Sequence, residues 1–481
     1  MKRKACALSA AGVAKSDQPL SYSLKQILQF TLQRQGLITR NASIGPELFP
    51  LHGTSHTTPH LSLLARVDNY QKKHLTDYLN QSEGNRLSYV LLRCMRGTLH
   101  VVPASQFDTV TAVYNRIDNV AADTRLNQFA LTENEVRFWK EQIRKRLLTE
   151  GPVTSATLAN SFKPKSKSGC DKGDNRTMTK YPVTMVTSKK DERLKQSTVG
   201  IVLNHMMWTS QVLFGLTDAA ANVSTGGDRW KKNGRSYGYA TLVKSHTCHS
   251  DMEIDTNDSP RRQLAEAAAL RDLAVWYFEL YSPASPADFA WWAGRGLREC
   301  RALLHGLREE GLLTPVRVVG MSQEMLILAS LQQELDCASG TELTGVRFLP
   351  YEDALIKAYK ETRYRFFAKQ TTDTECMADS AVERCIMWKG EAMPSIWVDG
   401  QIVGGWRWSN SVASPSLDVF FPPPTTDILV RTCSIGSGVD INEGSVVPAS
   451  LKTRILPELK LLCEMVGIDV ADVSFAFGTV R

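Results

Sequence analysis

The chain lacks two features that would place it in a membrane or outside the cell. No stretch of about 18 or more apolar residues occurs, so no segment is long enough for a transmembrane helix. The ten cysteines include no Cys-x-x-Cys pair, which argues against a zinc ribbon and against the disulfide framework of a small secreted domain. We therefore expect an intracellular protein with reduced thiols and no membrane association.

Acidic residues are missing from the start of the chain. No Asp or Glu precedes Asp17, and residues 1–20 are rich in basic and small side chains. This composition is typical of a disordered tail, and it leaves a cleaved targeting peptide open. At 481 residues the remainder exceeds a single hydrophobic core, so we expect several packed units after the tail.

Basic residues are in deficit only in the second half of the chain. Residues 251–481 carry 22 Lys and Arg against 32 Asp and Glu, whereas residues 1–250 carry 35 against 18. Residues 161–200 contribute ten basic and four acidic side chains, so the first half stays strongly basic without them. Clustered positive charge attracts phosphate backbones whatever their sequence. The N-terminal half is therefore predicted to bind a polyanion such as double-stranded DNA.

Two polar segments interrupt the apolar pattern of this basic half. Residues 52–60 include His52 and Thr54 and run directly into the helix-like residues 61–67. Farther on, residues 96–103 alternate polar and apolar side chains as a β-strand does, which places Arg96, Thr98 and His100 on one face. A core strand does not need three polar side chains on one face. The two segments together indicate a polar site near the start of a helix.

A metal site is the weaker interpretation of the first segment. His52, His56 and His60 are spaced four apart, as ligands on one helix face would be. Gly53 and Pro59 disfavour a continuous helix through them, and no acidic or cysteine ligand stands nearby in the sequence. We therefore expect no metal and no cofactor.

In this order, the two segments resemble the winged-helix DNA glycosylases of the AlkZ and YcaQ type. Members of that family carry a Gln-x-Gln or Gln-x-Asp motif just before a Leu-x-x-Arg helix, and then an Arg-Gly-Thr-Leu-His strand. Here the helix motif falls on residues 63–66 and the strand motif on residues 96–100. The catalytic motif differs, because His52-Gly53-Thr54 stands in the place of Gln-x-Gln.

The resemblance continues down the chain, from about residue 24 to residue 408. Residues 281–294 are similar to the third helix-turn-helix of the family, and residues 348–353 and 398–404 to its C-terminal β region. The resemblance implies an α+β fold of three tandem winged-helix units with a β-rich C-terminal part. The expected divisions are a tail at 1–20, winged-helix units at 21–130, 131–260 and 261–345, and the β-rich region at 346–481.

Local patterns predict the main elements within these units. Helices are expected at residues 24–34, 60–79, 133–148, 153–162 and 263–280, and a further helix from about residue 87 into the strand at 96–103. The fold is expected to resume, after the insert, at residues 199–212. Thr132 is the expected N-cap of the helix at 133–148. Residues 163–196, rich in Lys and Ser, are predicted to form a mobile basic insert. Asp399-Gly400 is a signal for a two-residue β-hairpin turn.

The resemblance also implies the activity and the site residues. The expected reaction is hydrolysis of the N-glycosidic bond of bulky or crosslinked N-alkylated purines in duplex DNA by a DNA-associated, monomeric and monofunctional glycosylase. His52 is expected to activate or position the attacking water, and Thr54 to hold it by a hydrogen bond. Residues 229–237 hold basic and aromatic side chains just before a predicted wing strand at 236–243. The expected DNA contacts are Arg66, Arg96, Thr98, His100, Arg229, Lys231, Lys232, Arg235 and Tyr237.

Other interpretations of the same residues stay open at this point. His52 can be a structural histidine, or the residue left in an inactive relative, in which case the protein is a non-catalytic winged-helix DNA-binding protein such as a damage sensor or regulator. RNA binding is a more remote alternative. Residues 229–237 can be an ordinary solvated loop, and Arg96 and His100 can serve structural hydrogen bonding at a strand edge. Trp291 and Trp292 are expected in the core.

Overall fold

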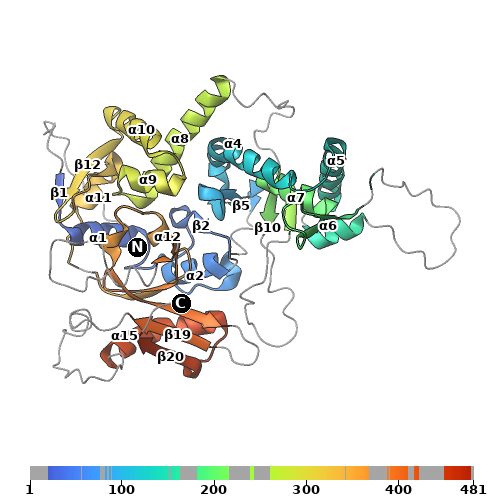
Figure 1. Cartoon of the computed structure of the whole chain (residues 1–481). Coiled ribbons are helices and arrows are strands. Elements are labelled where there is room, and N and C mark those ends of the chain that lie inside the picture. The colour runs from blue at the N-terminus through green and yellow to red at the C-terminus, as the bar shows by residue number, and fades with distance from the viewer. Residues whose placement is uncertain are drawn as a thin grey trace.

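A computed structural model contains both helices and strands (Figure 1), so the protein is of the α+β class. The structure describes residues 20–55, 57–75, 82–83, 86–87, 89–150, 153–162, 181, 183–215, 239–242, 260–341, 343–367, 387–388, 390–409, 416–421 and 449–477. The main helices are α1 (Leu24–Arg34), α2 (Thr57–Arg66), α4 (Phe107–Leu126), α5 (Glu133–Glu150), α6 (Ser155–Ser161), α7 (Thr198–Trp208), α8 (Pro260–Tyr281), α9 (Pro286–Ala293), α10 (Leu297–Glu309), α11 (Gln332–Asp336), α12 (Ala354–Lys357) and α15 (Ala449–Val466).

The strands form three main sheets. The six-stranded sheet has the order β2 (Leu51–His52), β6 (Thr98–Pro103), β5 (Tyr89–Cys94), β10 (Val212–Gly215), β11 (Tyr239–Leu242) and β7 (Val153–Thr154). The three-stranded sheet has the order β1 (Leu20–Tyr22), β12 (Leu313–Val318) and β13 (Met325–Leu328). The five-stranded sheet has the order β14 (Val346–Leu349), β17 (Ser395–Val398), β18 (Gln401–Ser409), β19 (Ser416–Phe421) and β20 (Val473–Phe477). The predicted β-rich C-terminal region is therefore present, with α15 packed against β14.

These elements gather into a few groups in space. In Figure 1, α5, α6 and α7 lie together at one end, α8, α9 and α10 lie at the top, and β19, β20 and α15 lie at the bottom. The short elements β2, α2 and α12 lie between these groups. One large hydrophobic core joins residues from Leu28 to Ile468, whereas α5, α6 and α7 share a separate core around Trp139 and Met206. The middle of the molecule is thus where distant parts of the chain meet.

Local signals predict several of these elements correctly. Thr132 caps α5 through a capping box, because its Oγ1 accepts from the Glu135 amide at 3.2 Å while the Glu135 carboxylate accepts from the Thr132 amide at 2.8 Å. Asp399 and Gly400 join β17 to β18 with φ values of 47° and 89°. Positive φ at both positions is what a type I′ hairpin turn requires, so this prediction is confirmed.

The apolar segment before the polar strand is a strand, not the predicted helix. Residues 89–94 form β5, which pairs antiparallel with β6 over its whole length. Five of its six side chains are buried, and a short run that is buried on both faces has no alternation to distinguish a strand from a helix. The polar strand also begins later than predicted, at Thr98. Arg96 and Gly97 form the turn before it, with φ values of 60° and 72°.

The predicted first unit, residues 21–130, does not keep its elements together. β1 pairs parallel with β12, with Leu20 opposite Val316. Tyr22, Ile27 and Phe30 from β1 and α1 bury their side chains in a core shared with β12 and β13. In addition, β5 and β10 pair within one sheet, so the predicted first and second units share a sheet. Three winged-helix units remain a prediction.

The second half of the predicted mobile insert is ordered into a hairpin. Within residues 163–196, β8 (Met185–Thr187) pairs antiparallel with β9 (Lys195–Ser197). The hairpin is held to the end of α4 by the Lys189 amide, which donates to the Gln128 carbonyl at 2.7 Å. Tyr181 and Val183 pack on the separate core of α5, α6 and α7. The prediction overlooked that apolar residues follow the Lys/Ser-rich stretch, of which residues 163–180 lie outside the described residues.

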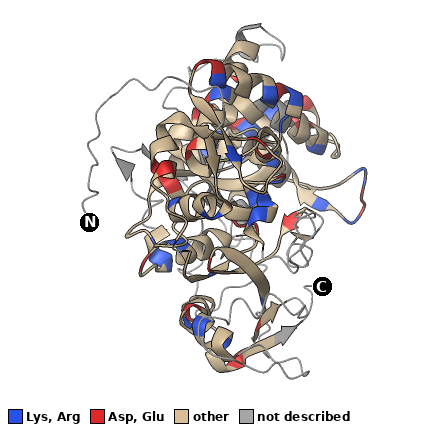
Figure 2. Ribbon diagram, turned by 90° about the vertical axis from the view of Figure 1, so that its left-hand side faces the viewer, with Lys and Arg blue, Asp and Glu red and all other residues tan. Residues whose placement is uncertain are grey.

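Charge is mixed over the described surface. Figure 2 shows Lys and Arg interleaved with Asp and Glu on the helices at the top of the view. Much of the basic surplus of the N-terminal half belongs to residues 2–4, 163–180 and 229–235, which lie outside the described part of the chain. No helix within the described part is both long and apolar enough to cross a bilayer.

Candidate active site

The register of β2 against β6 brings two histidines together. His52 lies directly opposite His100 in this antiparallel pair, so both side chains project from the same face of the sheet. Their ring centroids are 5.2 Å apart and nearly perpendicular. Gly53 follows at a point of close approach, where its amide donates to the Leu99 carbonyl at 2.7 Å and an added Cβ would lie 2.7 Å from the Leu91 side chain. Gly53 therefore lets β2 sit close to the β5–β6 hairpin.

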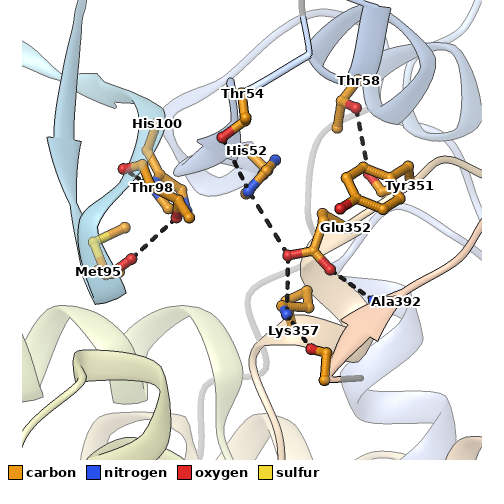
Figure 3. A network of polar contacts seen from close by, with 11 residues as sticks. His52, Thr54, Thr58, Met95, Thr98, His100, Tyr351, Glu352, Lys357 and Ala392 are labelled. Atoms are coloured by element: carbon orange, nitrogen blue, oxygen red, sulfur yellow. Dashed lines mark hydrogen bonds and ion pairs between the residues drawn. The ribbon is translucent and has the colours of Figure 1, made fainter. Parts of the chain in front are cut away.

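A second segment approaches His52 from the C-terminal sheet. Tyr351 and Glu352 form the turn between β14 and α12, and the Glu352 side chain points at His52 (Figure 3). Glu352 Oε2 lies 3.7 Å from His52 Nε2, and each of the two side chains is 6% exposed. The Tyr351 ring stands edge-on to His52 at 6.3 Å between centroids. Two segments 300 residues apart in sequence thus enclose one imidazole.

Thr54 and Lys357 complete this cluster. Thr54 Oγ1 lies 3.5 Å from His52 Nε2, and Thr54 itself is exposed. Lys357, the last residue of α12, places Nζ 2.9 Å from Glu352 Oε2 and donates to the Gly390 carbonyl at 2.9 Å. We call His52, Thr54, His100, Glu352 and Lys357 the polar site. Because Thr54 is its exposed member, the polar site meets solvent at that side chain.

Arg96 adds a second positive charge beside the polar site. Its guanidinium stacks on the Trp291 ring at 3.8 Å, and Lys357 Nζ lies 5.0 Å from the centroid of the same ring. Gly294, the left-handed C-cap of α9, makes this stacking possible, since an added Cβ would lie 3.2 Å from Arg96 Cγ. Trp291 therefore carries a cation–π contact and is only half-buried, whereas Trp292 is buried in the core as expected.

Burial and neighbouring charge keep both histidines neutral. Burial lowers the pKa of His52 well below 6.5, and the nearby His100, Lys357 and Arg96 lower it further. Burial also lowers the pKa of His100 to about 3, although a hydrogen bond to the Thr98 carbonyl opposes that shift. A neutral imidazole with a lowered pKa is a weak proton acceptor. This argues against His52 as a base that takes the proton from water at neutral pH.

Hydrogen bonds fix the orientation of the remaining predicted residues on β6. His100 Nδ1 donates to the Thr98 carbonyl at 3.1 Å, so in the neutral ring Nε2 is the unprotonated nitrogen. Thr98 Oγ1 donates to the Met95 carbonyl at 3.1 Å. Both side chains therefore make contacts within the β5–β6 hairpin, and His100 is buried.

Arg66 is not placed to contact DNA. Its guanidinium is 2% exposed and forms a bidentate ion pair with Asp353, at 2.8 and 2.6 Å. Asp353 also accepts from Ser62 Oγ at 3.4 Å and from the Leu355 amide at 2.9 Å, which caps α12. The expected DNA contact of Arg66 is wrong, because a buried guanidinium in a bidentate pair has no free face for the DNA. Arg66 instead joins α2 to α12.

The remaining predicted contacts lie outside the described residues: Arg229, Lys231, Lys232, Arg235 and Tyr237. Of the three histidines spaced four apart, His56 also lies outside the described residues. Within the described ranges, no three His, Cys, Asp or Glu side chains gather in a way that could hold a metal ion.

Two members of the polar site, Glu352 and Lys357, are not predicted from the sequence. Glu352 lies within the segment 348–353 that was matched to the family, and Lys357 follows four residues after its end. The available signal was an adjacent pair of carboxylates, Glu352 and Asp353, immediately after a strand that reads as buried. Nothing local connects that pair to His52.

The two histidines, the carboxylate and the flanking cations stand within a chain that matches a known enzyme family. The family model of AlkZ-like DNA glycosylases matches residues 47–419, so the chain belongs to that family of DNA-binding enzymes. Among solved structures, the fold is similar to that of the DNA glycosylase AlkZ of Streptomyces sahachiroi, with 16% sequence identity and a TM-score of 0.55 over 95% of this chain and 100% of that chain. No curated protein sequence matches the chain significantly.

Proposed function

We propose that the protein is a monofunctional glycosylase that removes bulky or crosslinked N-alkylated purines from duplex DNA. Membership of the AlkZ-like family supports N-glycosidic bond hydrolysis. The observation that carries the assignment to the polar site is the pairing of Thr54 Oγ1 with His52 Nε2, at 3.5 Å, on the side that meets solvent. In this scheme the protein acts as a monomer without a metal or cofactor.

The chemistry asks little of the protein beyond placing a water molecule. The target nucleotide leaves the base stack so that its glycosidic bond becomes accessible. A purine alkylated at N7 is already cationic and departs as a neutral base, so no general acid is needed. The sugar passes through an oxocarbenium-like state with positive charge at C1′. What remains for the site is to hold the attacking water and to stabilise that charge.

The polar site has suitable groups for the water. In the neutral His52 ring, an Nε2–H can donate to the water oxygen, and the Thr54 hydroxyl can accept one of the water protons. His52 thus serves as a positioning group, in agreement with its lowered pKa. Arg96, beside the polar site on Trp291, is the proposed contact for a DNA phosphate. Lys231, Lys232 and their neighbours remain proposed backbone contacts of the wing.

Excision from a defined lesion tests this function. The purified protein is incubated under single-turnover conditions with duplexes carrying N7-methylguanine or a bulkier N7 adduct at one position, and abasic sites are counted by strand cleavage. We expect excision of both lesions and none from the unmodified duplex. His52→Gln restores half of the Gln-x-Gln motif and is expected to keep more activity than His52→Ala.

The non-catalytic alternative gives the opposite result. It is favoured by one observation, the replacement of Gln-x-Gln by His52-Gly53-Thr54. If the wild-type protein and His52→Gln both bind damaged duplex tightly but release no base from either lesion, the protein is a damage-binding member of the family.

A further inference from the structure

We propose that Glu352 is a catalytic residue, which supplies to the polar site the carboxylate that His52-Gly53-Thr54 lacks. The proposal rests on the proposed function and names the group that accepts the proton from the attacking water. Its basis is the position of Glu352 Oε2, 3.7 Å from His52 Nε2, in a part of the site where both side chains are 6% exposed. Figure 3 shows Glu352 pointing from the C-terminal segment toward His52 and Thr54.

The backbone at Glu352 is held in a conformation that a glutamate adopts at a cost. Its φ is 58°, a left-handed value that is unfavourable for a non-glycine residue. Two contacts with Ala392 maintain it: the Glu352 amide donates to the Ala392 carbonyl at 2.8 Å, and Glu352 Oε1 accepts from the Ala392 amide at 2.6 Å. Glycine would make the same turn without strain. The strained conformation therefore points to a need for the side chain.

The two oxygens of Glu352 have different surroundings. Oε1 is held by the Ala392 amide, so the carboxylate cannot swing away from the turn. Oε2 receives Lys357 Nζ at 2.9 Å and faces His52 with its remaining lone pair. Lys357 balances the charge of the carboxylate, and it is anchored in turn by the Gly390 carbonyl. One oxygen fixes the group, and the other is available to the reaction.

The side chains of His52, Thr54 and Glu352 can together hold one water molecule in an orientation suited to attack. The water oxygen accepts from His52 Nε2–H, one of its protons points to Thr54 Oγ1, and the other points to Glu352 Oε2. The second lone pair of the water is then free to attack. Because the pKa of His52 is lowered well below 6.5, its neutral ring is a weak proton acceptor, and we assign the water proton to the carboxylate oxygen that faces the ring.

The reaction step balances with Glu352 as the acceptor. The water oxygen forms a bond to C1′ of the deoxyribose, while the C1′–N bond breaks and its electron pair leaves with the base. A cationic alkylated purine becomes neutral by taking that pair. The water proton passes to Glu352, which becomes a carboxylic acid and later returns the proton to solvent. Before the transfer, the negative carboxylate also stabilises the positive charge that develops on the sugar.

The test compares Glu352→Gln with Glu352→Asp and with a neighbouring control. Glutamine keeps the shape of the side chain and an oxygen for the Ala392 amide, but removes the charge. Aspartate keeps the charge on a side chain that is one methylene shorter. Glu391→Gln removes an exposed carboxylate next to Tyr351 and leaves the polar site intact. Single-turnover excision of N7-methylguanine, duplex affinity and thermal unfolding are measured for each variant, and the excision rate of wild type and Glu352→Gln is followed from neutral to acidic pH.

The expected result is specific to a catalytic carboxylate. Glu352→Gln should lose about 10²-fold or more in rate with duplex affinity nearly unchanged, Glu352→Asp should recover at least part of the loss, and Glu391→Gln should match wild type. A catalytic carboxylate acts only in its charged form, so the wild-type rate should fall at acidic pH and the rate of Glu352→Gln should not. Should Glu352→Gln fail to fold, the aspartate variant and the wild-type pH profile decide.

Two outcomes overturn the proposal separately from the function. Wild-type excision with a Glu352→Gln rate within about threefold of it contradicts the role of Glu352 and leaves the proposed function standing. A rate loss that aspartate does not relieve, with no acid fall in wild type, assigns Glu352 a structural role only. Absence of excision by wild type contradicts the proposed function itself.

Discussion

Glu352 and Asp353 are neighbours in sequence, but their carboxylates belong to two regions with different roles. Asp353 is fully buried and accepts hydrogen bonds from Arg66, Ser62 and the Leu355 amide. Glu352 has one oxygen bound to the backbone and the other facing His52, at a residue with positive φ. The backbone at Asp353 is unstrained and its carboxylate is used within the fold, whereas Glu352 has a positive φ and an Oε2 that, beside its partner Lys357, also faces His52.

This difference distinguishes residues that stabilise the fold from residues that can act in the reaction. A buried carboxylate whose oxygens are all used can stabilise only the fold. A buried carboxylate can take part in a reaction when one of its oxygens also faces a histidine. The histidine here, His52, has no hydrogen-bond partner for Nδ1 among the described residues. We therefore expect substitutions around Asp353 to destabilise the fold, and substitutions around Glu352 and His52 to slow or stop excision.

The largest effect is expected from Asp353→Ala. Its removal leaves the Arg66 guanidinium buried without a counter charge, which typically costs about 3–5 kcal/mol. The free energy of unfolding in urea measures it. As a control, Asp418→Ala breaks the Arg407–Asp418 pair, whose side chains are 53% and 31% exposed, and should cost no more than about 1 kcal/mol. Equal losses for the two variants would show that Asp353 is not a structural anchor.

His52→Ala should impair excision at the polar site without unfolding the protein. We expect excision to slow by about 10²-fold, equal to about 2.7 kcal/mol in activation free energy, because the water loses its positioning group. Single-turnover rates at saturating enzyme measure the loss. His205→Ala on α7 removes another buried histidine with a carboxylate partner, Asp123 at 2.9 Å, and should leave the excision rate unchanged. A slowed His205→Ala would instead indicate a general effect of losing a buried histidine.

Acid should destabilise the region of the histidines. The pKa of His100 is lowered from 6.5 to about 3 in the folded protein, so below pH 6.5 the unfolded chain takes up a proton that the folded chain does not. Stability is therefore complete above pH 6.5 and falls by up to about 1.4 kcal/mol per pH unit on acidification toward 3. In urea unfolding at pH 6 and pH 4.5, His100→Gln should remove that part of the slope. An unchanged slope would contradict the assignment of a neutral, buried His100.

The smallest effect is expected from Thr54→Ala. Its hydroxyl offers one neutral hydrogen bond to the water, worth roughly 0.5–1.5 kcal/mol, so the excision rate should fall by about 2- to 10-fold. Thr54 is exposed, and its removal should not change stability. A loss as large as that of His52→Ala would show that Thr54 does more than orient the water.

Local chemistry accounts for what the sequence predicted correctly. The hairpin at Asp399-Gly400 and the cap at Thr132 depend on residues next to each other, and both are found. The β-rich C-terminal region follows from the same kind of pattern. The strand at residues 89–94 was predicted as a helix because burial on both faces removes the periodicity that separates the two.

Long-range pairing accounts for what could not be predicted. The meeting of His52 with Glu352 depends on how β14 and α12 pack against β2, and no local pattern encodes that contact. Arg66 shows the same limit: a Leu-x-x-Arg helix is readable, but its pairing with Asp353, 287 positions away, is not. The sequence located one half of the polar site, and packing supplied the other half.

Because β1 pairs with β12, the N-terminal strand cannot complete its sheet until much later in synthesis. Tyr22 donates to Asp336, 314 positions later in the chain, so β1 and α1 leave the ribosome long before their partners exist. At about 5–20 residues per second, the wait is roughly 15–60 s. During that time the apolar side chains of Tyr22, Ile27 and Phe30, which end in a shared core, have no sheet to cover them. The apolar face of the N-terminal segment is therefore completed only after β12 and β13 have been synthesised.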